Sequence, residues 1–124
     1  MADEVKVIEV ETTVEVSLSV HVGGSFPYKS RLYEYPAAGG EPTPTGEEQT
    51  GTASVSIGKL TVGVVRRFVW SVAVVSNDEL EQTVDVAGHV VVGSKTVGTA
   101  KGSLTVKKPL QKCFVNVHVK GKGA

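Results

Sequence analysis

The fold of this chain is decided by one stretch, Phe68-Val69-Trp70-Ser71-Val72-Ala73-Val74-Val75. Apolar side chains occupy both its odd and its even positions, a pattern typical of a central β-strand that is covered on both faces. A buried helix is the alternative, but the stretch is rich in β-branched residues and lacks helix-capping residues. The stretch therefore predicts the centre of a β-sheet.

Outward from this stretch, further segments alternate apolar with polar residues, as strands with one solvated face do. These segments are 14–22, 53–57, 60–64, 83–92, 103–107 and 113–120, with Gly58-Lys59 between the second and the third. Val supplies about one residue in five, and its branched side chain favours strands. The sequence predicts an all-β fold, an antiparallel β-sandwich of the immunoglobulin-like or jelly-roll kind with about seven to nine strands. We expect a single domain over residues 1–124.

The order of elements over residues 68–119 resembles bacterial and phage immunoglobulin-like sandwich modules of the CARDB-like kind. The pieces that carry the resemblance are the segments 72–78, 83–89, 102–106 and 114–119, separated by an Asn-plus-acidic turn, a Gly turn and a polar turn. The resemblance implies a sandwich fold and a non-catalytic role.

The segment 23–51 interrupts the alternating pattern and concentrates unusual residues. It holds four of the seven aromatic residues and four of the five prolines. Tyr combines a large apolar ring with a hydroxyl and is favoured in contact surfaces. The segment is therefore either an arm that contacts a protein partner, or a sugar-stacking platform. In a third interpretation, Ser30 to Tyr35 is an ordinary strand and the Pro/Gly stretch is a hairpin tip. The candidate binding residues are Phe26, Tyr28, Lys29, Arg31, Tyr33 and Tyr35.

Charge is segregated along the chain although the formal net charge is zero. Residues 1–48 carry nine acids and three bases, whereas residues 86–124 carry seven bases and no acid. Pairing of the N-terminal with the C-terminal strand would bring Glu9, Glu11 and Glu15 near Lys107, Lys112 and Lys120. Alternatively, the two ends form complementary patches between subunits, or a basic face for an anionic polymer.

The residue patterns that could indicate catalysis or metal binding do not lie on the secondary structure that this chemistry requires. Ser56-Ile57-Gly58-Lys59 has the S-x-x-K spacing of penicillin-recognising enzymes, but it lies on a strand and turn rather than on a helix. The three histidines (His21, His89 and His118) fall on separate predicted strands, and Cys113 shares the parity of buried valines. We expect no catalytic residues, no metal and no cofactor.

These observations favour a non-enzymatic structural or interaction module. We expect it to form homo-oligomers, or to decorate a larger assembly such as a phage or virus-like particle. A carbohydrate-binding, lectin-like module that uses Tyr28, Tyr33, Tyr35 and Trp70 is the alternative. Zero net charge argues against nucleic acid as a partner. No signal peptide or apolar run of membrane-spanning length is visible, so we expect no membrane partner and a cytoplasmic or virion-associated location.

Overall fold

The computed structural model describes residues 7–11, 15–24, 26–76, 80–107 and 110–122. In this part of the chain the regular elements are all strands, so the prediction of an all-β fold is confirmed. They are β1 (Val7–Glu11), β2 (Val16–Val22), β3 (Tyr28–Tyr35), β4 (Thr43–Pro44), β5 (Gln49–Thr50), β6 (Ala53–Gly58), β7 (Val65–Val75), β8 (Gln82–Val92), β9 (Lys95–Val106) and β10 (Leu110–Lys122).

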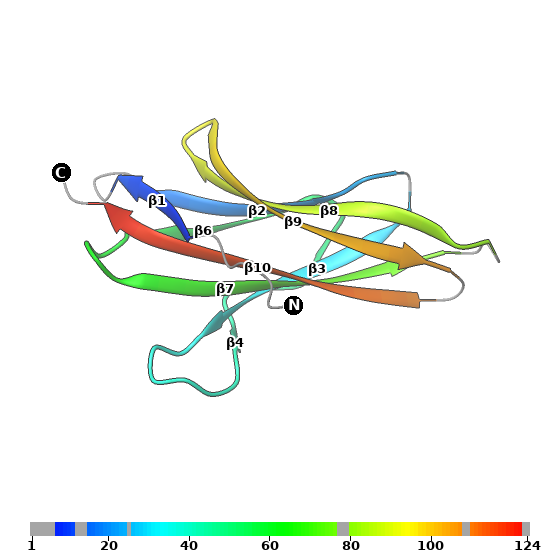
Figure 1. Cartoon of the computed structure of the whole chain (residues 1–124), viewed down its shortest axis with the longest axis horizontal. Coiled ribbons are helices and arrows are strands. Elements are labelled where there is room, and N and C mark those ends of the chain that lie inside the picture. The colour runs from blue at the N-terminus through cyan, green and yellow to red at the C-terminus, as the bar shows by residue number, and fades with distance from the viewer. Residues whose placement is uncertain (1–6, 12–14, 25, 77–79, 108–109, 123–124) are drawn as a thin grey trace.

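The strands form two sheets packed face to face, which confirms the β-sandwich (Figure 1). The six-stranded sheet has the order β1-β10-β7-β3-β4, and β5 also pairs with β3; the four-stranded sheet has the order β6-β2-β8-β9. The strand pairs are antiparallel except that β1 runs parallel to β10. The stretch that decides the fold lies in β7, between β10 and β3 at the centre of its sheet, as predicted.

The inward faces of both sheets meet in a core built mainly from valines, in which Trp70 and Phe68 are the largest fully buried side chains. Glycines on the four-stranded sheet leave the room that this core needs. A Cβ at Gly88 would lie 3.2 Å from Cδ1 of Trp70, and a Cβ at Gly98 would lie 2.6 Å from Cγ2 of Ile8. Glycine weakens a strand because it has no side chain to pack. At these positions it allows close approach of the two sheets.

One end of the sandwich is closed by an ion pair between β3 and β7. The Arg66 guanidinium donates hydrogen bonds of 2.8 Å to both carboxylate oxygens of Glu34, and a third of 3.0 Å to the Ile57 carbonyl on the other sheet. The same guanidinium lies 5.0 Å from the centre of the Phe68 ring. The hydrogen bonds to Glu34 and the negative charge of that carboxylate raise the pKa of Arg66, although burial opposes this. Arg66 therefore links the two sheets at this end of the apolar core, through its hydrogen bond to Ile57.

The segment 23–51 contains both a strand and a loop. Residues 28–35 form a strand of the sheet, in agreement with the strand interpretation of this segment. Within this segment, the loop between β3 and β4 projects from the sandwich (Figure 1). The first alternating part, 53–57, lies in β6, which ends at Gly58 with a φ of 75°. The prediction that the strand pattern resumes over 60–64 is wrong, since only Val62 forms an isolated bridge, to Gly121. Residue 14 and the predicted turns at 77–79 and 108–109 lie outside the described residues.

Some of the acidic residues of the N-terminal part lie beside basic residues of the C-terminal part, across the β1–β10 strand pair. β1 lies beside β10, with Glu9 opposite Lys120 and Glu11 opposite Lys122, as the pairing interpretation predicts. The other expected partners lie elsewhere. Glu15 accepts a hydrogen bond of 2.6 Å from the Ser56 hydroxyl, and Lys107 pairs with Glu81 at 3.4 Å.

Candidate functional site

The candidate site lies on the outer face of the six-stranded sheet, where the register of three strands brings aromatic side chains together. Tyr33 on β3 lies opposite Val69 on β7, and Phe114 on β10 lies opposite Ser71. Partner residues of an antiparallel pair project on the same side of the sheet. Tyr35 follows Tyr33 by two positions and therefore also points outward. We call this surface, made of Tyr33, Tyr35, Val69, Ser71 and Phe114, the aromatic face.

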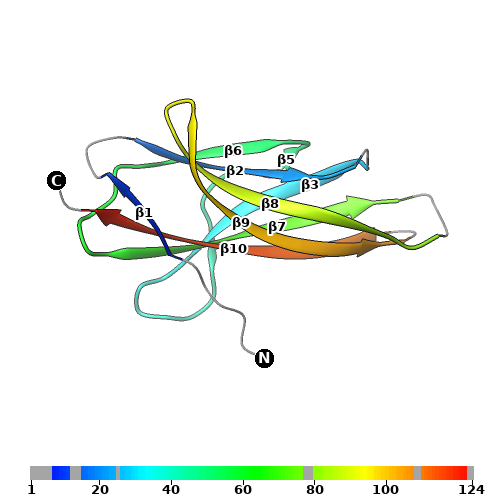
Figure 2. The same ribbon diagram turned by 45° about the horizontal axis from the view of Figure 1, so that its top comes forward.

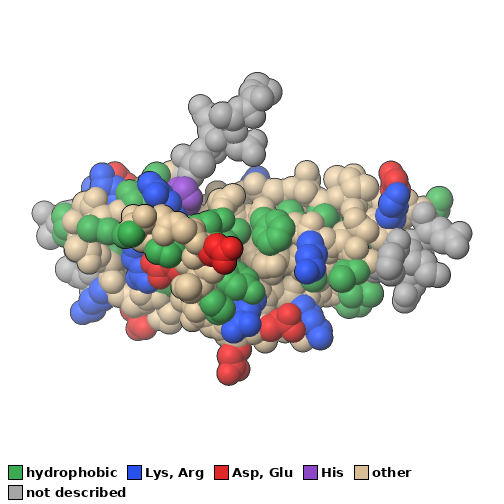
Figure 3. Space-filling model, turned by 90° about the horizontal axis from the view of Figure 1, so that it is seen from below, with side chains coloured by type: hydrophobic (Ala, Val, Ile, Leu, Met, Phe, Trp, Pro, Cys, Tyr) green, Lys and Arg blue, Asp and Glu red, His purple; other side chains and the backbone are tan. Residues whose placement is uncertain are grey.

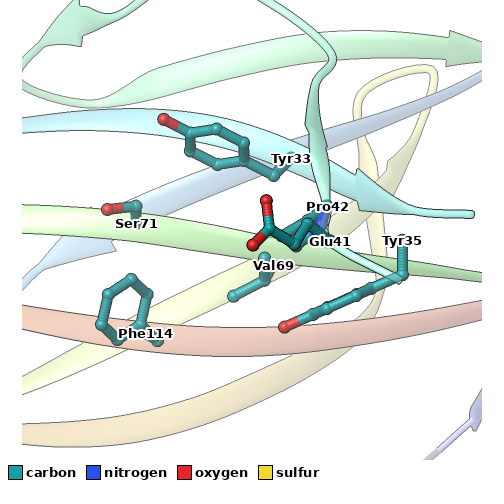
Figure 4. A pocket seen from close by; sticks show the side chains of 7 residues that line it. All are labelled: Tyr33, Tyr35, Glu41, Pro42, Val69, Ser71 and Phe114. Atoms are coloured by element: carbon teal, nitrogen blue, oxygen red, sulfur yellow. The ribbon is translucent and has the colours of Figure 1, made fainter. Parts of the chain in front are cut away.

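The loop between β3 and β4 borders one side of the aromatic face. Glu41 and Pro42 from this loop complete the lining of an open hollow of about 400 Å³ (Figure 4). The base of the loop is held to the sheet because Thr45 N donates a hydrogen bond of 2.8 Å to the Leu32 carbonyl. The hollow thus combines ring surfaces with a carboxylate from Glu41 and a hydroxyl from Ser71.

Phe114 is the most unusual residue of the aromatic face. Its side chain is 62% exposed, whereas Val69 beneath the same hollow is 5% exposed. Single exposed hydrophobic residues are common on proteins, but this exposed Phe lies in a cluster with two Tyr. The prediction that β7 is covered on both faces holds only in part: Val69 is covered on this side as Trp70 is on the other, but the outward Val75 is 44% exposed.

Basic side chains flank the aromatic face. Lys29 and Lys112 lie opposite Ala73 in one row, and Arg67 lies opposite Tyr35 further along the sheet. Arg31 donates a hydrogen bond of 2.9 Å from Nε to the Gly46 carbonyl, and its guanidinium lies 5.9 Å from the centre of the Tyr33 ring. At the outward positions of β3, β7 and β10, as far as the structure describes them, acidic residues are absent. Figure 3 looks onto this face, where hydrophobic side chains lie among charged ones.

The six predicted site residues do not form one site. Lys29, Arg31, Tyr33 and Tyr35 point outward as a group. Tyr28 points inward and is 8% exposed, with its hydroxyl 3.1 Å from that of Thr52. Phe26 packs against the core and lines a separate hollow beside Gly23 and Gly24.

Two further corrections concern aromatic residues. Trp70, which the lectin alternative placed in the sugar site, is fully buried and cannot stack on a ligand. Phe114 was missed, although the sequence holds a signal for it. Cys113, Val115 and Val117 share one parity and are buried, so Phe114 falls on the polar, outward parity of the same strand.

The histidines and the cysteine lie apart. His21 and His89 are on the four-stranded sheet, within 3.5 Å of Thr52 and 3.0 Å of Thr99 respectively, while His118 is on β10. Burial and the charge of Arg67 lower the pKa of His118. Burial raises the pKa of the Cys113 thiol, since it disfavours the thiolate. Within the described ranges, no three His, Cys, Asp or Glu side chains gather as metal ligands would.

Over the described residues the chain has no helix with the length and apolar character needed to cross a membrane. Comparison of the chain with models of known protein families, with curated proteins and with solved structures gives no match.

Proposed function

We propose that this chain is a non-enzymatic structural or interaction module that self-associates, or attaches to a larger assembly, through its aromatic face. The observation that carries the proposal is the exposed Phe114 beside Tyr33 and Tyr35 on an ordered sheet. Large aromatic rings on a rigid surface bury much apolar area for little loss of side-chain entropy. The flanking Lys29 and Lys112 would orient the partner on this face and favour a partner that places acidic residues opposite them.

Apolar and polar groups are also arranged on the aromatic face as they are in protein–protein interfaces. Interfaces typically have an aromatic centre with a polar rim. Here the centre is formed by Phe114, Tyr33 and Tyr35, and the rim by Lys29, Lys112 and Arg67. A particle component or accessory subunit needs such a surface and needs no catalytic group.

Sedimentation velocity at rising concentration tests the proposal. We expect the wild-type chain to associate at about 10–100 µM, and Phe114→Ala to weaken that association. Leu80→Ala is the matched control, since Leu80 is also an exposed apolar residue, 77% exposed, but lies outside the aromatic face. A wild-type chain that remains monomeric at low and high salt, or association that Phe114→Ala leaves unchanged, would contradict the proposal.

A carbohydrate ligand is the second candidate, favoured by the hollow itself. Sugar rings stack on aromatic faces, and Tyr33, Tyr35 and Phe114 supply three of them around the Glu41 carboxylate, which can accept hydroxyl hydrogen bonds. A glycan array would show binding that is lost in the double variant Tyr33→Ala/Tyr35→Ala. An array without any bound glycan would remove this candidate.

A further inference from the structure

Three exposed basic residues lie around the rings of the aromatic face. Lys29 on β3, Arg67 on β7 and Lys112 on β10 point outward from strands that lie side by side (Figure 2). Within the described residues none of the three forms an ion pair. Lys120 and Lys122, further along β10, are not counted with them because they lie opposite acids of β1. In the strand register the three basic residues face no acid, since their partners are Ala73, Thr50, Tyr35 and His118.

The basic residues bracket the aromatic rings along the sheet. Successive outward residues of a strand are about 7 Å apart. Lys112 precedes Phe114 by one such step on β10. At the other end, Arg67 shares its row with Tyr35 on β3, one step beyond Tyr33. Rings and basic residues together therefore extend over about 20 Å of the sheet.

This combination suits a single strand of nucleic acid. Phosphates are attracted to Lys and Arg, and unpaired nucleobases stack on aromatic rings with little regard to sequence. Sheets that bind single-stranded RNA stack about two or three nucleobases on outward rings, and Phe114, Tyr33 and Tyr35 supply three rings. A duplex keeps its nucleobases inside its own stack, so it cannot use these rings.

Two further side chains affect where such a strand can lie. The Arg31 guanidinium, 5.9 Å from the centre of the Tyr33 ring, adds positive charge on the β3 side. Glu41 lines the hollow from the loop and would repel a phosphate, but its carboxylate can accept a hydrogen bond from the amino group of a nucleobase. We therefore expect nucleobases in the hollow and phosphates beside the basic residues around it.

We propose that the aromatic face binds single-stranded nucleic acid, with nucleobases stacked on its three rings and phosphates held by the three basic residues that bracket them. This inference rests on the aromatic face being a contact surface, as proposed above, and names a partner for it. The net charge of zero does not oppose binding. At about 0.1 M salt a charge acts over only about 10 Å, so the strand responds to this face rather than to the whole chain.

Fluorescence anisotropy of a labelled oligothymidylate of about 12 nucleotides tests the inference. We expect a dissociation constant of about 1–100 µM at low salt. Three phosphate contacts predict a slope of about −2 for the logarithm of the association constant against the logarithm of the salt concentration. Binding should therefore weaken about 15-fold when the salt concentration rises fourfold.

Two variants separate the contribution of charge from that of stacking. Lys29→Ala/Lys112→Ala leaves one phosphate contact, so it should weaken binding and reduce the slope to about −0.7. Phe114→Ala should weaken binding about tenfold and leave the slope unchanged, because stacking releases no counterions. The control, Lys95→Ala/Lys101→Ala, removes the same charge from β9 of the other sheet and should bind as wild type does.

Absence of binding at about 100 µM protein would overturn the inference. If Phe114→Ala still weakens self-association in that case, the proposed function stands and the partner is a protein. A duplex that binds as tightly as the single strand, or equal binding by wild type and Phe114→Ala, would also overturn the inference, because the rings would then take no part. Binding by a wild-type chain that stays monomeric would support it while contradicting self-association.

Discussion

The packing of β1 against β9 can be tested by adding one methyl group at Gly98. A Cβ at this position would lie 2.6, 2.7 and 2.8 Å from three side-chain carbons of Ile8. Carbon atoms in contact prefer separations of about 3.5–4.0 Å. Gly98 is not among the glycines with positive φ, so the backbone itself accepts Ala. The contact with Ile8 therefore decides the effect of Gly98→Ala.

The expected cost follows from two opposing effects. Overpacking of a filled core costs about 1–3 kcal/mol. Replacing Gly by Ala in a compatible backbone restores about 0.4–1 kcal/mol through the unfolded state. Since Ile8 is only 6% exposed and has little space to move, we expect Gly98→Ala to lower the free energy of unfolding by about 1–2 kcal/mol.

Urea denaturation followed by Trp fluorescence measures this free energy, because Trp70 is the single Trp and is fully buried. Gly102→Ala is the matched control on the same strand, where the nearest atoms would lie 3.4 and 3.7 Å away in ordinary contact. We expect that variant to equal the wild type or to be more stable by about 0.5 kcal/mol. In an Ile8→Ala background the cost of Gly98→Ala should disappear. The reasoning is refuted if Gly98→Ala is as stable as wild type, or costs the same in both backgrounds.

Three further predictions concern polar groups. The Ser30 hydroxyl is buried without a hydrogen-bond partner, so Ser30→Ala should leave the free energy of unfolding unchanged or raise it by about 1 kcal/mol, and a loss above that size in urea denaturation would contradict this. Glu34→Gln should lower the same quantity by about 1 kcal/mol, because the Glu34–Arg66 pair is only 28% exposed but still solvent-screened; an unchanged denaturation midpoint would count against it. The lowered pKa of His118 means that the unfolded chain binds a proton at higher pH than the folded chain. Stability should therefore fall as the pH drops below about 6.5, and denaturation at two pH values should show a smaller drop in His118→Gln.

The sequence predicts those strands whose pattern of apolar and polar residues can be recognised within the strand itself. The alternation in β2 and β8 and the two-sided stretch in β7 each depend on neighbours two residues away, so the pattern can be read locally. Ile57 and Leu60 show where prediction from the local pattern fails. Both are buried, yet only Ile57 is in a strand, because the positive φ of Gly58 turns the chain.

The candidate site was predicted only in part, since it is assembled from three strands. Parity could have separated Tyr28, which points inward, from Tyr33 and Tyr35, which point outward. The position of Phe114 beside them depends on β10 pairing with β7, a contact between residues distant in sequence. Such pairing is set by the packing of the whole core, which no local pattern encodes.

Hydroxyl-radical footprinting at low and high protein concentration tests most directly whether the aromatic face is the contact surface. Our account predicts that oxidation of Phe114, Tyr33 and Tyr35 falls as the chain associates, while Trp70, already fully buried, reacts little at either concentration. Equal oxidation of the three outward rings at both concentrations, or protection confined to His21 and His89 on the other sheet, would contradict it.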